Sequence, residues 1–236
     1  MIWEEYKNYL NDDEKTRRLH ALTGDIDTIK PPPEYARIWK DVSFEVQRRK
    51  AQRHGLNQSE MVECLVGLQK RPYYLVHMAK QFGVKNIVEV GTAQGLQFYS
   101  FAKYIKDTQN GGQVWSCDIE DCRDNEWYKE EYSAEAIYCS GTSATLGENL
   151  RTQGIEVDLF YIDADHRRNA VLQDVANLRH LQTDESLWVF DDFDLRFGCY
   201  HDIIQLCKKS GCFKIYRVGD AASGNPNHQV IIFGKL

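Results

Sequence analysis

Two apolar segments of this chain each end in acidic residues. The segment 157–162 runs into Asp163, and the segment 187–190 runs into Asp191 and Asp192. Short segments rich in β-branched and aromatic residues are typical of strands buried on both faces of a parallel sheet. Because ligands of open α/β sheets bind at the carboxyl ends of such strands, we expect the acids to meet at one edge of the sheet.

The spacing of apolar residues from position 86 onward predicts the fold class. Strand-like segments at 87–90, 114–118, 136–139, 157–162 and 187–190 alternate with helix-like segments near 96–105, 144–153, 168–181 and 199–210. This alternation predicts a Rossmann-like α/β fold, with a mostly parallel sheet and helices on both faces. Two further segments, 213–218 and 229–233, have no crossover helix between them. They predict an antiparallel hairpin at one end of a seven-stranded sheet.

The first part of the chain has a different pattern. Residues 1–83 show helical rather than strand periodicity, interrupted by three consecutive prolines at 31–33 that cannot continue a helix. We therefore predict two parts, an N-terminal helical extension over residues 1–83 and an α/β core over residues 84–236.

Composition narrows the class of partner. A net charge of -6 provides no broad basic field, which argues against nucleic acid and anionic membranes and favours a small-molecule partner. Seven cysteines without a C-x-x-C pair favour neither a disulfide framework nor a zinc site. A charged N-terminus and the lack of a long apolar run predict a cytoplasmic protein.

The turn after the first predicted strand suggests a ligand with two charges. It places Glu89 before Gly91, Thr92 and Gly95, directly ahead of a predicted helix. The glycines allow close backbone approach, and the helix N-terminus offers free N–H groups to an anion. The spacing G-x-x-x-G differs from the G-x-G-x-x-G of dinucleotide enzymes, so a ligand with an ammonium and a carboxylate fits better. Asp118, at the end of the second strand, can accept hydrogen bonds from ribose hydroxyls.

Charge repulsion between the acids at the sheet edge indicates a cation site. The carboxylates of Asp163, Asp191 and Asp192 would raise one another's pKa unless a cation joined them. Oxygen ligands of this kind suit Mg²⁺ or another hard divalent cation. The alternative is that these residues cap the helices that follow the strands.

These motifs resemble the class I S-adenosylmethionine-dependent methyltransferases. Within that class, the chain from about residue 86 to 236 is similar to metal-dependent O-methyltransferases such as catechol O-methyltransferase and the macrolide and aminocoumarin sugar O-methyltransferases. The resemblance implies that the turn from Glu89 to Gly95 holds the methionine part of S-adenosylmethionine and that Asp118 holds its ribose. It further implies that a segment with Gly141, Thr142 and Ser143 lines the adenine.

The resemblance also assigns the metal and the base. Asp163 corresponds to the first metal ligand and Asp191–Asp192 to the acidic pair, which begins 28 residues later. His166 stands where catechol enzymes carry a catalytic lysine and some sugar enzymes a histidine base. Asp165 is a competing base, since some relatives use an aspartate at that place. Both the Asp-Asp pair and the histidine depart from the catechol pattern, in which the pair is Asp-Asn.

The combined expectation is a Mg²⁺-dependent O-methyltransferase. It would move a methyl group from S-adenosylmethionine to a hydroxyl of a polar small molecule, such as a sugar or glycosylated compound. A catechol-type enzyme acting on vicinal aromatic hydroxyls and a non-catalytic S-adenosylmethionine-binding module are the alternatives. In the resembling family, N-terminal helices form a lid and often a dimer contact, so residues 1–83 are expected to cover the site and a homo-oligomer is a further expectation.

Overall fold

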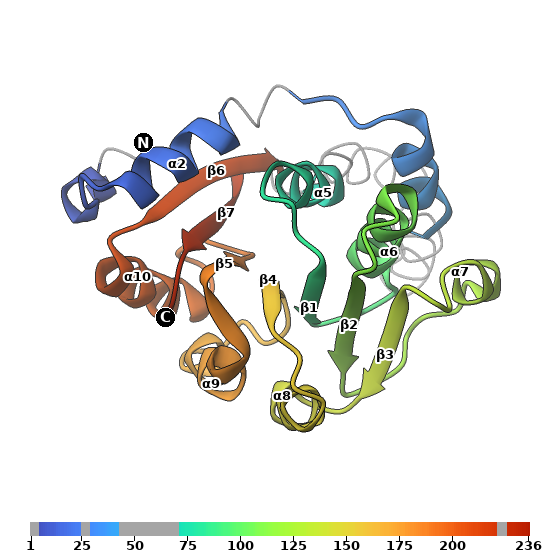
Figure 1. The fold of residues 1–236 in the computed structure, drawn as a ribbon. Coiled ribbons are helices and arrows are strands. Elements are labelled where there is room, and N and C mark those ends of the chain that lie inside the picture. The colour runs from blue at the N-terminus through green and yellow to red at the C-terminus, as the bar shows by residue number, and fades with distance from the viewer. Residues whose placement is uncertain (1–4, 25–28, 43–70, 221–225) are drawn as a thin grey trace.

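A seven-stranded sheet forms the centre of the molecule (Figure 1). The computed structural model describes all residues except 1–4, 25–28, 43–70 and 221–225. The strands lie in the order β3-β2-β1-β4-β5-β7-β6. Their bounds are β1 Asn86–Val90, β2 Gln113–Asp118, β3 Ala136–Ser140, β4 Val157–Ile162, β5 Gln182–Phe190, β6 Phe213–Asp220 and β7 Pro226–Phe233.

The direction of the strands agrees with the predicted topology. Strands β1 to β5 pair in parallel, while β7 pairs antiparallel with both β5 and β6. The predicted α/β fold with a C-terminal antiparallel hairpin is therefore confirmed. Strand order reverses between β1 and β4, the place where open sheets of this kind bind ligands.

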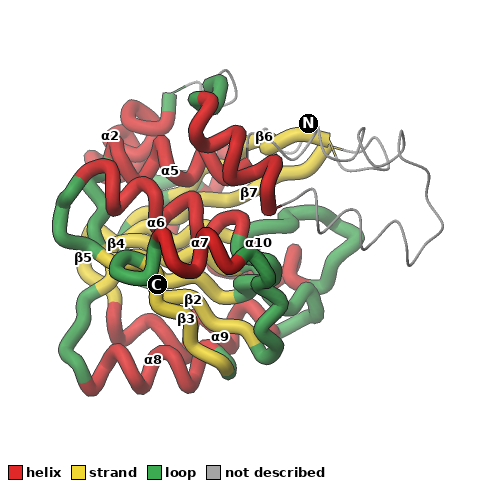
Figure 2. Tube along the Cα trace, turned by 90° about the vertical axis from the view of Figure 1, so that its right-hand side faces the viewer, coloured by secondary structure: helices red, strands yellow, loops and turns green. Residues whose placement is uncertain are grey.

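Helices cover both faces of the sheet (Figures 1 and 2). On one face lie α2 (Glu14–Thr23), α5 (Arg71–Gln81), α6 (Leu96–Thr108) and α7 (Glu126–Glu131), and on the other α8 (Ser143–Thr152), α9 (Ala170–Leu178) and α10 (Cys199–Ser210). Short 3-10 turns occupy Lys7–Tyr9 and Arg179–Leu181. Among the described helices of the α/β core, α7 has no sequence counterpart, and it is only six residues long.

The N-terminal part is helical where it is described. Besides α2 and α5, residues 33–42 form a helix, and buried side chains of all three join the same hydrophobic cluster as α6. The predicted division at residue 83 stays a prediction, and much of the expected lid, residues 43–70, lies outside the described residues. None of the described helices is long and apolar enough to cross a membrane.

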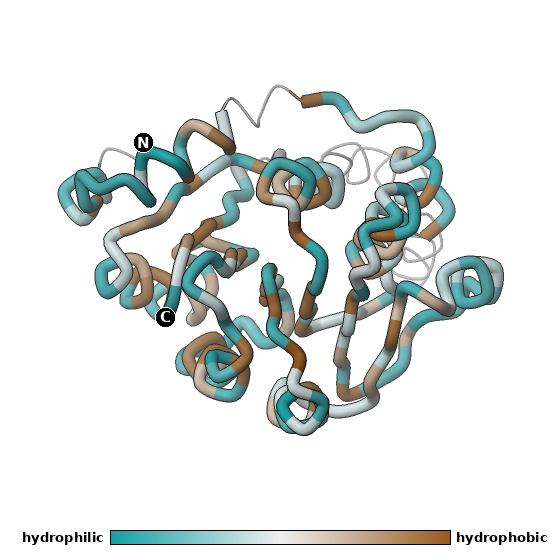
Figure 3. The backbone as a smooth tube through the Cα atoms, in the orientation of Figure 1, coloured by the Kyte–Doolittle hydropathy of each residue, from teal (hydrophilic) through white to brown (hydrophobic). Residues whose placement is uncertain are grey.

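Two hydrophobic layers hold the helices to the sheet. Figure 3 shows hydrophobic stretches along the strands and mixed hydropathy along the helices, as amphipathic helices require. Trp188 of β5 is fully buried and stacks on Phe160 of β4, with ring centroids 3.9 Å apart. Burying an aromatic side chain of this kind contributes about 1.5–3 kcal/mol, so these two strands are firmly joined beneath the acids that follow them.

Backbone hydrogen bonds continue past the strand ends into the loops. In each case, the first residue after one strand donates its N–H to the last or next-to-last residue of the neighbouring strand. These bonds join Gly91 to Cys117 (2.9 Å), Asp163 to Val90 (2.9 Å) and Asp191 to Ile162 (3.1 Å). The loops that carry the candidate site are therefore fixed at one level along the edge of the sheet.

Gly91 is needed where two of these loops cross. Its φ is +97°, and a Cβ built on it would lie 2.1 Å from the carbonyl oxygen of Asp163. Both the left-handed backbone and the close approach exclude a larger residue.

Gly91→Ala should therefore destabilise the protein severely. Gly83→Ala is a matched control, because Gly83 also has a positive φ (+65°) but a Cβ at that position would have nothing within 4 Å. We expect the control to lose about 1–2 kcal/mol of unfolding free energy from backbone strain alone, and Gly91→Ala to lose clearly more. Urea denaturation measures both, and equal losses would show that the crossing tolerates a methyl group.

Candidate functional site

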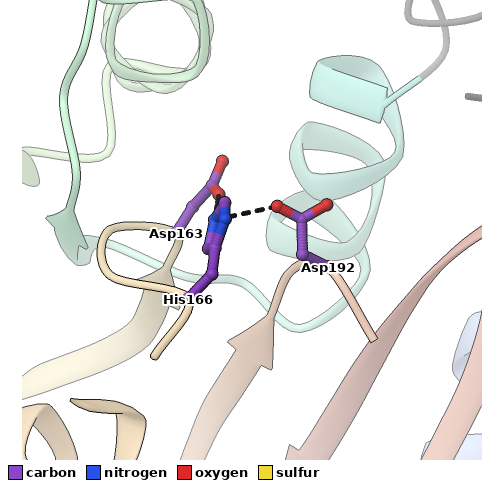
Figure 4. A group of neighbouring side chains, drawn as sticks. All are labelled: Asp163, His166 and Asp192. Atoms are coloured by element: carbon purple, nitrogen blue, oxygen red, sulfur yellow. Dashed lines mark ion pairs between the residues drawn. The ribbon is translucent and has the colours of Figure 1, made fainter. Parts of the chain in front are cut away.

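Asp163, His166 and Asp192 converge at the carboxyl edge of the sheet (Figure 4). One potential ligand atom from each residue lies within 4.8 Å of the others. The Nε2 atom of His166 is 2.9 Å from Oδ2 of Asp192 and 3.7 Å from Oδ1 of Asp163. Asp163 follows β4 and Asp192 follows β5, and these strands are parallel neighbours, so the acids arrive at the same level.

The two carboxylates change the protonation of His166. Hydrogen bonding to Asp163 and Asp192 raises the pKa of His166 to about 10, against the opposing effect of burial. In the absence of a metal ion the imidazole is therefore protonated at neutral pH. A positive charge then lies between the two carboxylates, at the place where a divalent cation would bind.

Asp191 has a different position from its neighbour. It is buried, and its Oδ1 accepts a hydrogen bond from the backbone N–H of Asp192 at 2.8 Å. Its Oδ2 accepts one from the hydroxyl of Tyr161 at 2.7 Å. Of the three predicted metal ligands, the structure brings together Asp163 and Asp192 and places Asp191 beneath them.

Asp165 is held away from this group by a neighbour. Its carboxylate pairs with the guanidinium of Arg167 (Nη2 to Oδ2, 2.5 Å), which lowers the pKa of Asp165. A carboxylate stabilised in this way is a weak base. The Asp165 carboxylate is therefore engaged by Arg167, whereas His166 lies between Asp163 and Asp192.

The donor set is compatible with a divalent cation. Two carboxylates can hold Mg²⁺ while water or substrate oxygens complete its coordination, and an imidazole can either coordinate or accept a proton nearby. Asp192 has a left-handed backbone, with φ +49°, which turns its carboxylate toward Asp163 and His166. Such a conformation in a residue other than glycine is uncommon outside turns and functional sites.

Glu89 lies in the sheet just below the glycine turn. It is 1% exposed, and its Oε2 accepts a hydrogen bond from Ser116 at 2.5 Å; the Ser116 hydroxyl also contacts that of Thr92 at 2.5 Å. Burial raises the pKa of Glu89 well above its ordinary value. A cationic group beside this carboxyl would lower its pKa, and the predicted ammonium contact would have that effect.

Asp118 joins the glycine turn to the segment after β3. Its Oδ2 accepts a hydrogen bond from the backbone N–H of Ala93 at 2.9 Å. Its backbone carbonyl accepts one from Gly141 at 2.8 Å. The structure thus brings the three predicted parts of the cofactor site, the turn from Gly91 to Gly95, Asp118 and Gly141, to one place.

The remaining predicted adenine residues begin α8. Thr142 is its N-cap residue but makes no side-chain capping bond. Ser143 is buried; its hydroxyl donates to Asp174 at 2.6 Å and accepts from Asn177 at 2.9 Å, both on α9. The hydroxyl of Ser143 therefore joins two helices, and only its backbone is left for a ligand.

Three further residues beside the site were not predicted from the sequence. Gln97, in the first turn of α6, is 7% exposed, and neither atom of its side-chain amide has a partner within the described structure. Ile119, directly after Asp118, is 81% exposed. Tyr161 contacts Asp163 and Asp191 through its hydroxyl. Gln97 and Ile119 lie close to the glycine turn and to a strand-end acid, which is the signal that could have identified them, whereas Tyr161 lies in an apolar strand that predicts core packing.

The raised pKa of His166 predicts how the metal-free protein responds to pH. The pKa is higher in the folded state than its ordinary value of 6.5. The stability that the ion pairs contribute is therefore fully present below about pH 6.5 and is lost as the pH rises toward 10. In EDTA, the Tm difference between wild type and His166→Gln should be largest near pH 6 and should shrink as the pH rises toward 10. A difference that grows with pH would contradict this protonation state.

Comparison with known proteins finds one similar family. Residues 88–193 match the family model described as a methyltransferase domain, a span that includes the glycine turn and every acid of the site. The match covers less than half of the chain and shows that this segment is similar to methyltransferase domains. No curated protein shows detectable sequence similarity to the chain.

Solved structures share the fold at low sequence identity. The O-methyltransferase from Bacillus cereus in complex with SAH has a TM-score of 0.61 at 14% identity, covering 89% of this chain and 94% of that one. The O-methyltransferase TomG from Streptomyces achromogenes, involved in tomaymycin synthesis and in complex with SAM, also has a TM-score of 0.61, at 11% identity. That alignment covers 98% of this chain and 99% of TomG.

Proposed function

We propose that this protein is a Mg²⁺-dependent O-methyltransferase that transfers a methyl group from S-adenosylmethionine to a hydroxyl of a polar small molecule. The observation that carries the proposal is the convergence of Asp163, His166 and Asp192 beside a glycine turn, in a segment similar to methyltransferase domains. The two structural neighbours described as O-methyltransferases with SAH or SAM bound support the reaction class.

The cofactor would bind along the carboxyl ends of β1 and β2. Asp118 would accept hydrogen bonds from the ribose, and the exposed side chain of Ile119 offers an apolar surface for the adenine. The unpartnered amide of Gln97 and the free N–H groups of the α6 N-terminus suit the carboxylate of the methionine part. A buried polar group without a partner costs about 1–3 kcal/mol, so such a contact would also relieve a cost of the free protein.

The metal and the acceptor would bind beside the methionine part. Asp163 and Asp192 would hold the cation, with Asp191 supporting them from below. When bound, S-adenosylmethionine supplies the methyl group, and Mg²⁺ lowers the pKa of the acceptor hydroxyl and orients it. The side chains of the site provide the remaining functions, which are to hold the acceptor and to remove its proton.

His166 is the proposed base. Between two free carboxylates its imidazole is already protonated, since its pKa is raised to about 10. Once Asp163 and Asp192 coordinate a cation they stabilise the imidazolium less, and the neutral Nε2 can accept the proton of the acceptor hydroxyl. His166 as a third metal ligand is the alternative that the same geometry allows.

A sugar or glycosylated acceptor is the proposed substrate class, on the basis of the histidine and the Asp-Asp pair. One observation favours a second candidate, a catechol-type acceptor with vicinal aromatic hydroxyls. The ring of Phe197 lies 4.8 Å from that of His166, which gives the metal position an aromatic neighbour. An aromatic acceptor could pack against this ring.

A methylation assay with and without divalent cation tests the proposed function. With a library of hydroxylated compounds and S-adenosylmethionine, EDTA should abolish formation of S-adenosylhomocysteine and added Mg²⁺ should restore it. Asp192→Asn should strongly weaken the response to Mg²⁺ while leaving S-adenosylmethionine affinity, measured by calorimetry, within about twofold of wild type. Full turnover in chelator would rule out the metal-dependent mechanism.

Two alanine variants separate the candidate bases. If His166 accepts the proton, His166→Ala should slow the chemical step by about 10²–10⁴-fold with Mg²⁺ affinity largely retained. Asp165→Ala should have a much smaller effect, because Arg167 already holds that carboxylate. Single-turnover kinetics measures the step. A loss of Mg²⁺ affinity in His166→Ala as large as the loss of rate would instead identify the imidazole as a ligand. A large loss of rate in Asp165→Ala, with His166→Ala nearly normal, would reverse the two roles.

A further inference from the structure

Tyr161 is a buried residue of β4 whose hydroxyl lies between two carboxylates. Its oxygen is 2.9 Å from Oδ2 of Asp163 and 2.7 Å from Oδ2 of Asp191. The side chain is 2% exposed, and its ring packs edge-on against that of Phe101 on α6. These contacts hold the Tyr161 hydroxyl in place next to Asp163 and Asp191.

Oδ1 of Asp163 faces the site because Oδ2 is hydrogen-bonded to Tyr161. Oδ2 accepts from Tyr161, and Oδ1 is the atom that lies 3.7 Å from the imidazole Nε2 of His166. A carboxylate with one oxygen bonded in this way has little freedom to rotate. Tyr161 therefore orients Asp163 directly.

Asp192 is reached through one more residue. Asp191 accepts from Tyr161 with Oδ2 and from the backbone N–H of Asp192 with Oδ1. The second bond supports the left-handed backbone of Asp192, with φ +49°, on which the direction of that carboxylate depends. The single hydroxyl proton of Tyr161 is thus shared between Asp163 and Asp191, and through Asp191 the phenol also supports Asp192.

Buried side chains of the C-terminal hairpin contact the Tyr161 hydroxyl directly or through one another. The amide Nε2 of Gln229, on β7, lies 3.5 Å from the Tyr161 hydroxyl, and its Oε1 accepts from Tyr216 of β6 at 2.5 Å. Gln229 is fully buried, and Tyr216 is 3% exposed. The amide has both of its ends engaged, so the hydroxyl proton of Tyr161 is left for the carboxylates.

We propose that Tyr161 is a positioning residue of the cation site, which fixes Asp163 directly and Asp192 through Asp191, and that Gln229 directs its hydroxyl. The inference rests on the proposed function, because it assumes that Asp163 and Asp192 hold a divalent cation. Residues that orient metal ligands through hydrogen bonds typically contribute about 10-fold to 100-fold to metal affinity. Tyr161 touches neither substrate nor cofactor in this scheme.

Mn²⁺ binding to the metal-free protein tests the proposal without any turnover. Electron paramagnetic resonance of free Mn²⁺ gives the dissociation constant. Tyr161→Phe removes only the hydroxyl and should weaken binding by about 10-fold to 100-fold. Tyr104→Phe is the matched control, because Tyr104 is similarly buried and its hydroxyl donates to the backbone carbonyls of Ala79 and Val84 rather than to an acid of the site. The control should bind Mn²⁺ as wild type does.

Thermal melting in EDTA separates positioning from general destabilisation. Both variants should lose Tm, and only Tyr161→Phe should lose Mn²⁺ affinity. If Tyr161→Phe does not fold, Gln229→Leu takes its place, with an expected loss of about threefold or more. Unchanged Mn²⁺ affinity in folded Tyr161→Phe, or an equal loss of affinity in Tyr104→Phe, would overturn the positioning role of Tyr161 but not the proposed metal-dependent function. Failure of the wild-type protein to bind Mn²⁺ would overturn the metal-dependent function, and this inference with it.

Discussion

Repulsion between acids that arrive at one edge of a sheet is the constraint on which this structure depends. Strands β4 and β5 are parallel neighbours, with Tyr161 opposite Val189, so Asp163 and Asp191 emerge at the same level, followed by Asp192. Three carboxylates so close together need donors or positive charge around them. In the free protein the Tyr161 hydroxyl and the His166 imidazolium provide both. The stacked aromatic rings below and the backbone bonds between loops keep the groups at this spacing.

Much of the fold could be predicted from the sequence, because strand and helix periods are local properties. The alternation after residue 86 and the lack of a crossover before residue 229 were sufficient for the α/β class and the final hairpin. Two elements were less predictable. Strand β5 begins at Gln182 rather than 187, since its polar start pairs beside β4 only through a bulge. Helix α7 is short and polar, and it is held by Tyr128 and Tyr132, which pack on Tyr99.

The convergence of Asp163, His166 and Asp192 could be predicted from the sequence, but the different orientations of the acids could not. Strand-end positions identify Asp163, Asp191, Asp192 and His166, yet nothing local distinguishes the acid that faces outward from the one that faces inward. That difference follows from one backbone angle and from the hydroxyl of Tyr161, a residue whose place in an apolar strand predicts only core packing. The protonation of His166 likewise depends on contacts across space. Neither the direction of the acids nor the protonation of His166 produces a periodic pattern in the sequence.

The left-handed backbone of Asp192 limits which residue types this position can accommodate. Most L-residues lose about 1–2 kcal/mol in this conformation, while glycine, asparagine and aspartate tolerate it. Among these three, only aspartate carries a negative charge. Glutamate would keep the charge but bear the backbone strain, and asparagine would keep the backbone but lose the charge. Aspartate and asparagine, the residue of the catechol pattern, therefore both suit this backbone, and only aspartate adds a charge that pairs with His166.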